Sequence, residues 1–155
     1  MGKKSEARRL LRRYLARRYH AKENRIILQK RMNQLKSELR CGEEAGHNLE
    51  GIKASVDYLR GTIHAQIILE TFIIKEVDAA IRLLPQDSTE RTILELRHVD
   101  CLTWAEIVKT TNRSRSGCNA YYNKGLDALL EQPMVRVKLA QFKTCLKPPP
   151  PGVEG

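Results

Sequence analysis

Residues 103–130 have the sequence TWAEIVKTTNRSRSGCNAYYNKGLDALL, in which two short helices are predicted. Thr103 and Glu106 have capping-box spacing, which marks the start of the first helix. A short turn is expected at Thr111-Asn112, and Ser114 is a suitable N-cap for a second helix that runs through residue 130. Pro133 disrupts that helix. The buried side of the second helix is expected to carry Cys118, Tyr121, Leu126 and Leu129.

A helix, a short turn and a second helix opened by Ser and Arg are typical of a helix-turn-helix. In such a motif the N-terminal residues of the second helix enter the major groove of DNA, where Arg grips guanine and Asn grips adenine. The residues expected to contact bases are Arg115, Ser116, Asn119 and Asn123. Contacts to DNA phosphates are expected from the helix N-terminus and from Thr103, Arg113, Ser114 and Lys124. A small helical bundle without a DNA partner has the same capped helices and stays open as an alternative.

Another short helix is predicted before this motif. Asp87 and Glu90 have capping-box spacing, and the apolar side of the helix would consist of Ile93, Leu94 and Leu96. The helix is expected to end near residues 98–100. Trp104 is interpreted as a core residue between the short helices rather than as a base-stacking residue.

The first half of the chain is predicted to form two long helices. Residues 5–39 contain no Gly or Pro, and Leu28, Met32, Leu35 and Leu39 form a short coiled-coil seam. After Cys41-Gly42, a second helix begins near Asn48 or Leu49 and ends at Pro85. Its apolar stripe is expected at Ile52, Val56, Leu59, Ile63, Ile67, Ile73 or Ile74, Val77, Ile81 and Leu84. The two helices form either an antiparallel hairpin or a stalk that pairs with a second copy, so a homodimer is one expectation.

The predicted fold class is therefore all-α, with long N-terminal helices followed by a small helix-turn-helix bundle. Three regions are expected: a basic helical region over 1–84, a DNA-binding domain over 85–132, and a tail over 133–155. The tail includes a weakly amphipathic piece with Leu139, Phe142 and Leu146. The prolines at 148–151 are expected to be polyproline-like or without fixed structure.

Positive charge is concentrated in the first quarter of the chain. Of the net charge of +10, residues 1–40 contribute +11, with 14 Lys and Arg against three acids. Leu10, Leu11, Tyr14 and Leu15 lie on one side of the predicted helix. The other side forms a basic arm of Arg8, Arg9, Arg12, Arg13 and Arg17. Phosphate, an acidic protein surface and anionic lipid are all chemically suitable partners for this arm, and a solvated helix face is the plain alternative.

Several functional classes are disfavoured by what the sequence lacks. His20, His47, His64 and His98 are scattered without zinc-site spacing, and no P-loop, GxGxxG or GxSxG is present. An enzyme, a metal site and a cofactor are therefore not expected. The four cysteines lack CxxC spacing and are expected to be reduced. No apolar run is long enough for a membrane span and no export signal is visible, so a cytoplasmic protein without a membrane partner is expected.

The segment LPQDSTERTILELRHVDCLTWAEIVKTTNRSRSGCNAYYNKGLDALL, residues 84–130, resembles region 4 of bacterial sigma factors. It is more similar still to the small phage and prophage late-gene transcription regulators of the ArpU and RinA groups. The matching residues are Leu84-Pro85, Leu94-Glu95-Leu96-Arg97, Leu102-Thr103-Trp104, Glu106-Ile107, Ser114-Arg115, Lys124, Leu126 and Leu129. The resemblance implies a DNA-binding helix-turn-helix whose recognition helix starts at Ser114. It also implies a nucleoid-associated regulator in a bacterial host, with host RNA polymerase as a further partner.

The functional prediction is a sequence-specific regulator that binds double-stranded DNA. Residues 85–132 alone have a net charge of −1, so affinity would need dimerisation or the basic arm. Two other classes of function stay open. One is a DNA-packaging component similar to a small terminase subunit, and the other is a helical scaffold that binds acidic partners through residues 1–40.

Overall fold

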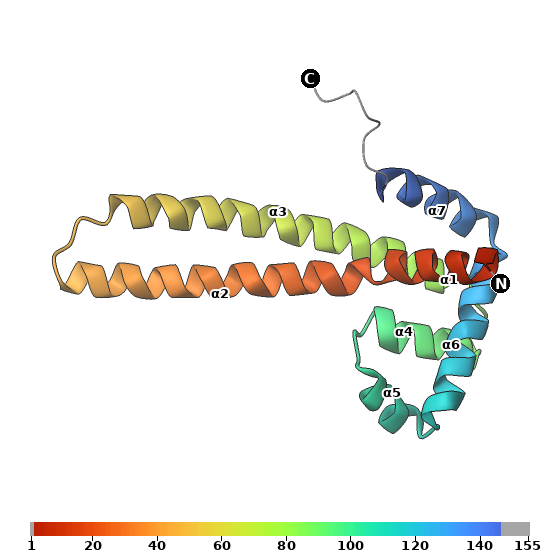
Figure 1. Ribbon diagram of the computed structural model, residues 1–155. Helices are drawn as coiled ribbons and strands as arrows, with labels where there is room; N and C mark the ends of the chain where they lie inside the picture. Colours follow the sequence, from red (N-terminus) through yellow and green to blue (C-terminus); the bar gives the residue numbers. More distant parts are fainter. Residues whose placement is uncertain (1, 147–155) are drawn as a thin grey trace. The chain divides into compact units, whose positions relative to one another are not determined.

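The computed structural model describes residues 2–146, and within this range the protein is built from seven helices without a strand. The all-α fold class is therefore confirmed (Figure 1). The helices are α1 (Gly2–Leu15), α2 (Arg17–Glu44), α3 (Glu50–Ile81), α4 (Thr89–His98), α5 (Trp104–Thr111), α6 (Arg115–Leu130) and α7 (Pro133–Leu146). They divide into two compact units. The hairpin unit comprises residues 18–75, and the bundle unit comprises residues up to 17 together with those from 76 onward.

The hairpin unit is an antiparallel pair formed by α2 and most of α3 (Figure 1). Gly46 turns the chain between them with a positive φ of 74°, which suits a residue without a side chain. The predicted seam and stripe pack against each other within one chain. Met32, Val56, Leu59 and Ile63 are buried together, and Leu28, Leu35 and Ile52 cover them. The antiparallel hairpin expected from the sequence is therefore observed within one chain.

One position of the predicted stripe is wrong. Ile67 is 43% exposed, whereas Glu70 is buried and binds the guanidinium groups of Arg18 at 2.7 Å and Arg25 at 2.6 Å. Over seven residues a straight helix turns to within about 20° of two full turns, so Glu70 lies on almost the same side of α3 as Ile63. Ile67 is rotated by about 40° to the other side of Ile63. The hairpin therefore contains a buried ion cluster where hydrophobic spacing had indicated isoleucine.

The bundle unit contains the three short helices α4, α5 and α6 together with α1 and α7. Helices α4 and α6 cross closely at Gly125. A Cβ on this residue would lie 2.8 Å from Leu94 Cδ1, so the close approach favours glycine here. Helix α1 packs on α6 and α7, with Leu11 and Leu15 fully buried. The first helix is thus part of the bundle core, although the sequence analysis grouped it with the other residues before 85. Periodicity indicated which side of α1 is apolar, but the partner of that side depends on long-range packing.

The helix starts largely agree with the sequence. The predicted capping box of α5 is present, because Thr103 Oγ1 accepts from the backbone N–H of Glu106 at 3.2 Å and the Glu106 carboxylate accepts in return. The N-cap of α4 is Ser88 rather than Asp87, since Ser88 Oγ accepts from the N–H of Arg91. Ser and Asp are both good N-caps, so adjacent candidates cannot be separated by residue type.

Residues 133–146 differ from the tail that was expected there. Pro133 is the first residue of α7, a position that suits proline because the missing N–H needs no partner. Val135 and Leu139 of α7 are buried, and the helix contacts α1 and α6. The proline-rich stretch after residue 147, for which an extended or unfixed structure was predicted, lies outside the described residues. No helix of the described chain is long and apolar enough to cross a membrane.

Truncation of Leu11 tests whether α1 belongs to the bundle core. Leu11→Ala should lower the free energy of unfolding by about 2–4 kcal/mol, because a fully buried leucine leaves a cavity when shortened. The neighbouring Leu10 is only half-buried, so Leu10→Ala is the matched control and should cost about 1 kcal/mol or less. Urea unfolding followed by the fluorescence of Trp104, the one tryptophan of the chain, measures both. Equal losses for the two variants would contradict this packing.

Candidate nucleic-acid interface

The turn between α5 and α6 places the predicted base-contacting residues at the exposed start of α6. Asn112 follows α5 in a left-handed conformation with φ of 53°, which reverses the chain at the expected turn. Ser114 Oγ then accepts a hydrogen bond from the backbone N–H of Gly117 at 3.0 Å and caps α6, as predicted. In the first turns that follow, Arg115, Ser116 and Asn119 are exposed and Asn123 is half-buried.

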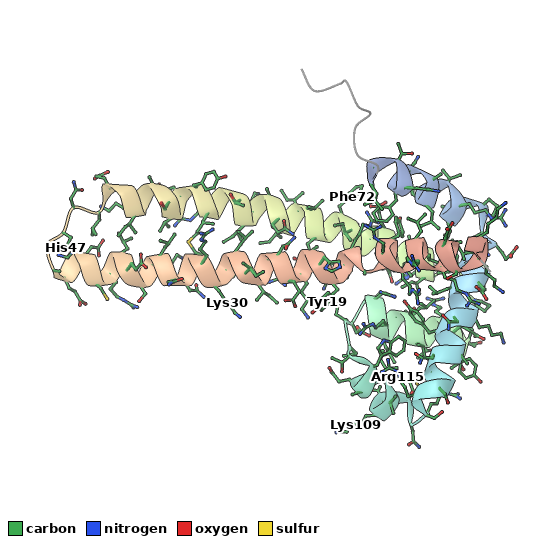
Figure 2. All side chains as sticks on the ribbon, viewed as in Figure 1. Tyr19, Lys30, His47, Phe72, Lys109 and Arg115 are labelled. Atoms are coloured by element: carbon green, nitrogen blue, oxygen red, sulfur yellow. The ribbon has the colours of Figure 1, made fainter. Side chains whose placement is uncertain are left out.

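A cleft of about 430 Å³ lies beside these turns of α6. Figure 2 shows Arg115 extending from α6 on the side of α4 and α5. The cleft is lined by Arg12, Ala16, Arg97, His98, Trp104, Arg115, Asn119, Tyr122 and Asn123. Three of these residues are arginines and none is acidic. The cleft therefore offers cationic and amide hydrogen-bond donors without an opposing carboxylate, which suits an anionic ligand.

The structure brings three of the four predicted base-contacting residues together. Arg115, Asn119 and Asn123 follow one another at intervals of four residues, so they form a row on one flank of α6. Ser116 does not line the cleft, and its Oγ lies 3.4 Å from Ser114 Oγ at the helix start. The row could be anticipated from helical spacing, whereas the cleft beside it could not.

Trp104 holds two of the cleft arginines. Its indole lies edge-on to the ring of Tyr122 at 5.0 Å between centroids, which agrees with a packing role between helices. The guanidinium carbons of Arg115 and Arg97 lie 4.8 and 5.2 Å from the centroid of the indole. Arg97 Nη1 also donates to the carbonyl of Leu102 at 2.9 Å. Cation–π contacts of this kind contribute about 0.5–1 kcal/mol each at exposed sites, and they restrict where the two guanidinium groups point.

The buried tyrosine of α6 is Tyr122, so the prediction of Tyr121 is wrong. Tyr122 lies four residues from both Cys118 and Leu126, which places it near the middle of the buried face. Tyr121 lies at the edge of that face, half-buried, with the Arg113 guanidinium carbon 4.9 Å from its ring centroid. Two adjacent tyrosines differ by about 100° on the helix, and the four-residue spacing of Cys118, Tyr122 and Leu126 is the sequence signal that could have separated them.

A buried histidine forms the floor of the cleft. His98 Nε2 and the Tyr122 hydroxyl share a hydrogen bond of 2.8 Å. Burial, with a smaller contribution from the charge of Arg97, lowers the pKa of His98 to about 3. Burial also raises the pKa of Tyr122 to about 12. Both groups are therefore neutral at pH 7, and the charge of the cleft comes from its arginines.

Three of the four predicted phosphate-contacting residues have partners inside the protein. The Thr103 hydroxyl binds the Glu106 carboxylate at 2.9 Å, and Ser114 caps α6 as described above. Lys124 Nζ lies 3.1 Å from Glu90 Oε1, and this contact, after the backbone hydrogen bond at Glu90, lowers the pKa of the Glu90 carboxyl. Arg113 is exposed and stacks on Tyr121. Contacts of Thr103 or Lys124 with phosphate would have to compete with these internal bonds, whereas the Ser114 hydroxyl accepts the capping bond and could still donate to a phosphate.

The predicted basic arm is not one continuous surface. Arg8 makes a bidentate pair with Asp127, with N–O distances of 2.7 and 2.6 Å, and this hydrogen bonding lowers the pKa of Asp127. Arg17 lies 3.4 Å from Glu76 and stacks on Tyr14. The other three arginines are exposed in two places, because Arg12 lines the cleft while Arg9 and Arg13 line a groove with Lys3 and Lys143.

Sequence reasoning missed that Arg12 and Arg97 line the same cleft beside α6. Arg97 was noted only as part of the family resemblance, and Arg12 only as a member of the basic arm. The two residues are 85 positions apart, and no sequence pattern connects them. Their convergence follows from the packing of α1 against α6, which is a tertiary contact.

Within residues 2–146, no group of three or more His, Cys, Asp and Glu side chains is arranged to hold a metal ion. No family model, curated protein or solved structure matches the chain. The similarity to sigma region 4 and to the phage regulators therefore rests on the motifs of residues 84–130 alone.

The low pKa of His98 predicts how stability depends on pH. An unfolded histidine binds a proton below about pH 6.5, whereas folded His98 stays neutral down to about pH 3, so stability is lost as the pH falls between these values. His98→Gln should flatten the pH dependence of the free energy of unfolding between pH 6.5 and 5. The difference from the unmodified protein should approach about 1 kcal/mol per pH unit in this window. Urea titrations followed by Trp104 fluorescence measure it, and identical pH profiles would show that His98 titrates normally.

Proposed function

We propose that the bundle unit binds double-stranded DNA and that the chain is a sequence-specific transcription regulator. The observation that carries the proposal is the row of Arg115, Asn119 and Asn123 on α6, flanked by the acid-free cleft. Arg and Asn are the side chains that best recognise guanine and adenine edges in the major groove. The turn before α6 and its Ser114 N-cap fit the form of a helix-turn-helix.

The charge of the cleft also supports a nucleic-acid ligand. Residues 85–132 have a net charge of −1, which is unfavourable for binding phosphate. Helix α1 adds Arg12 to the cleft, next to Arg97 and Arg115. A cluster of guanidinium groups without a carboxylate is stabilised when an anion binds, because their mutual repulsion is then reduced.

The resemblance of residues 84–130 supports a regulator of the phage or prophage late-gene type, similar to the ArpU and RinA groups. In that case it would act on DNA in the cytoplasm of a bacterial host, and host RNA polymerase would be a further partner. A scaffold function is favoured by a different observation. The groove lined by Lys3, Arg9, Arg13 and Lys143 also contains Ala7, Leu10 and Leu146, and Glu6 is its one acidic residue, so four positive charges against one suit an acidic protein segment with apolar residues.

Base specificity is tested at Arg115 and Asn119. A preferred site is first selected from random duplexes, and binding is then measured to all its single-base variants. Arg115→Ala and Asn119→Ala should each reduce discrimination at one or two positions by about 1–3 kcal/mol, since each removes a bidentate contact to a base. Arg113 is an exposed arginine directly before the N-cap of α6 and is expected to contact phosphate. Arg113→Ala should therefore weaken binding to all sequences by similar factors. Unchanged preferences in both variants, or failure to select any site, would contradict base recognition by α6.

The contribution of α1 is tested by the salt dependence of binding. Arg12→Gln should reduce the slope of log K against log salt by about 0.9, the value expected for one lost phosphate contact. Arg9→Gln is the matched control, because Arg9 is exposed on the same helix but lines the other groove. Deleting the first residues is unsuitable, since it would remove Leu11 and Leu15 from the core. A slope that changes with Arg9 and not with Arg12 would place the DNA outside the cleft and favour the basic groove.

A further inference from the structure

Helix α3 has a second apolar face that the hairpin does not use. Its inner face carries Val56, Leu59 and Ile63 against α2. On the remaining surface, Tyr58, Ile67, Ile68, Leu69 and Phe72 are large apolar side chains that are exposed. Figure 2 shows Phe72 on the side of α3 that faces away from α2. An exposed apolar surface of this extent is typical of an interaction site.

The outer face has the periodicity of a coiled-coil seam. Alternating steps of three and four residues define an outer stripe of α3, all of whose members are exposed: Tyr58, Gly61, Ala65, Ile68, Phe72 and Lys75. This 3–4 spacing is the heptad pattern by which one helix packs against another. Glu70 is buried in the hairpin and lies on the opposite side of α3, so the stripe is separate from the hairpin core.

Gly61 is not explained by the hairpin itself. Glycine is a poor helix former, and it persists in helices where another group approaches closely. At Gly61, however, a Cβ would have nothing within 4 Å. The space beside this residue is therefore open in a single chain, and the position suits a large side chain from outside it.

We propose that the outer stripe of α3 binds the same stripe of a second copy of this chain, with the two helices antiparallel. In a two-fold symmetric antiparallel pair, the residue number rises along one helix as it falls along the other, so two facing positions always have the same total. Gly61 therefore faces Phe72, Ala65 faces Ile68, and Tyr58 faces Lys75. The first two layers pair a small residue with a large one, which fills space evenly. The third places an ammonium group beside an aromatic ring. Each layer occurs twice because of the two-fold symmetry.

A parallel pair fits the same residues poorly. It would place Gly61 against Gly61 and leave a void, crowd Phe72 against Phe72, and bring Lys75 close to Lys75. The residues beside the stripe also favour self-pairing. Between Asp57 and Glu76, the positions that flank the stripe are occupied by residues other than Asp, Glu, Lys and Arg, namely Thr62, His64, Leu69 and Thr71. Identical helices can therefore approach without repulsion between like charges in the centre of the interface.

The oligomeric state provides the first test. Sedimentation of the full chain at micromolar concentration should give twice the mass of one chain, which is 17.8 kDa. Ile68→Glu and Phe72→Glu should each shift the protein to monomer, by at least a tenfold rise in the dissociation constant. Ile27→Glu is the matched control, because Ile27 of α2 is 60% exposed, as Ile68 is 59% exposed, yet lies outside the stripe. Monomeric unmodified protein, or dissociation by Ile27→Glu to the same extent, would overturn the proposal.

Cross-linking tests the antiparallel direction and does not depend on DNA binding. The exposed Cys41 and Cys145 are first changed to serine, and Tyr58→Cys and Lys75→Cys are made separately in that background. Mixing the two variants under oxidation should give a disulfide between them. Either variant alone should cross-link little, since identical positions would lie about 25 Å apart along the helices. Efficient cross-linking of each variant with itself would show a parallel pair and contradict the proposed arrangement.

Discussion

Leu11 and Leu15 on one face of α1 are fully buried, and the positions of the basic residues on this helix follow from that burial. Helix α1 is amphipathic, so fixing its apolar face against α6 and α7 also fixes the direction of each arginine. Arg8 meets Asp127, and Arg12 joins the cleft beside α6. Because α1 is packed in the bundle, it is not a separate solvated basic arm. Its Arg12 is instead part of the proposed binding surface.

The cleft brings positive charges together at some cost to the fold. Arg12, Arg97 and Arg115 converge without a carboxylate, and repulsion between them is reduced only by solvent and by aromatic contacts. The indole of Trp104 and the carbonyl of Leu102 hold Arg97 and Arg115 in defined directions. Such an arrangement contributes little to stability, and it would suit the recognition of an anion. The hydrogen-bonded His98–Tyr122 pair, neutral at pH 7, lines the same cleft without adding charge.

The two faces of α3 serve different purposes. The inner face completes the hairpin through aliphatic packing and through Glu70 with its two arginines. The outer face is not needed for that packing, yet it keeps a regular heptad pattern in which two small residues, Gly61 and Ala65, precede two large ones, Ile68 and Phe72. In the proposed dimer, one long helix would both complete the hairpin and contact the second chain. A two-fold symmetric regulator would in turn suit a DNA site with two related halves.

The sequence by itself determined the all-α class, the bounds of the short helices to within a few residues, and the row of Arg115, Asn119 and Asn123 along one flank of α6. These features depend on local rules, namely capping residues, turn residues and helical spacing, which act over a few positions. It did not determine that α1 belongs to the bundle, that Glu70 replaces Ile67 in the hairpin, or that α7 is a packed helix. Each of these was decided by tertiary structure. Which face of a helix is buried depends on the partner that covers it, and partners distant in sequence are joined by packing that leaves no periodic signal in the chain.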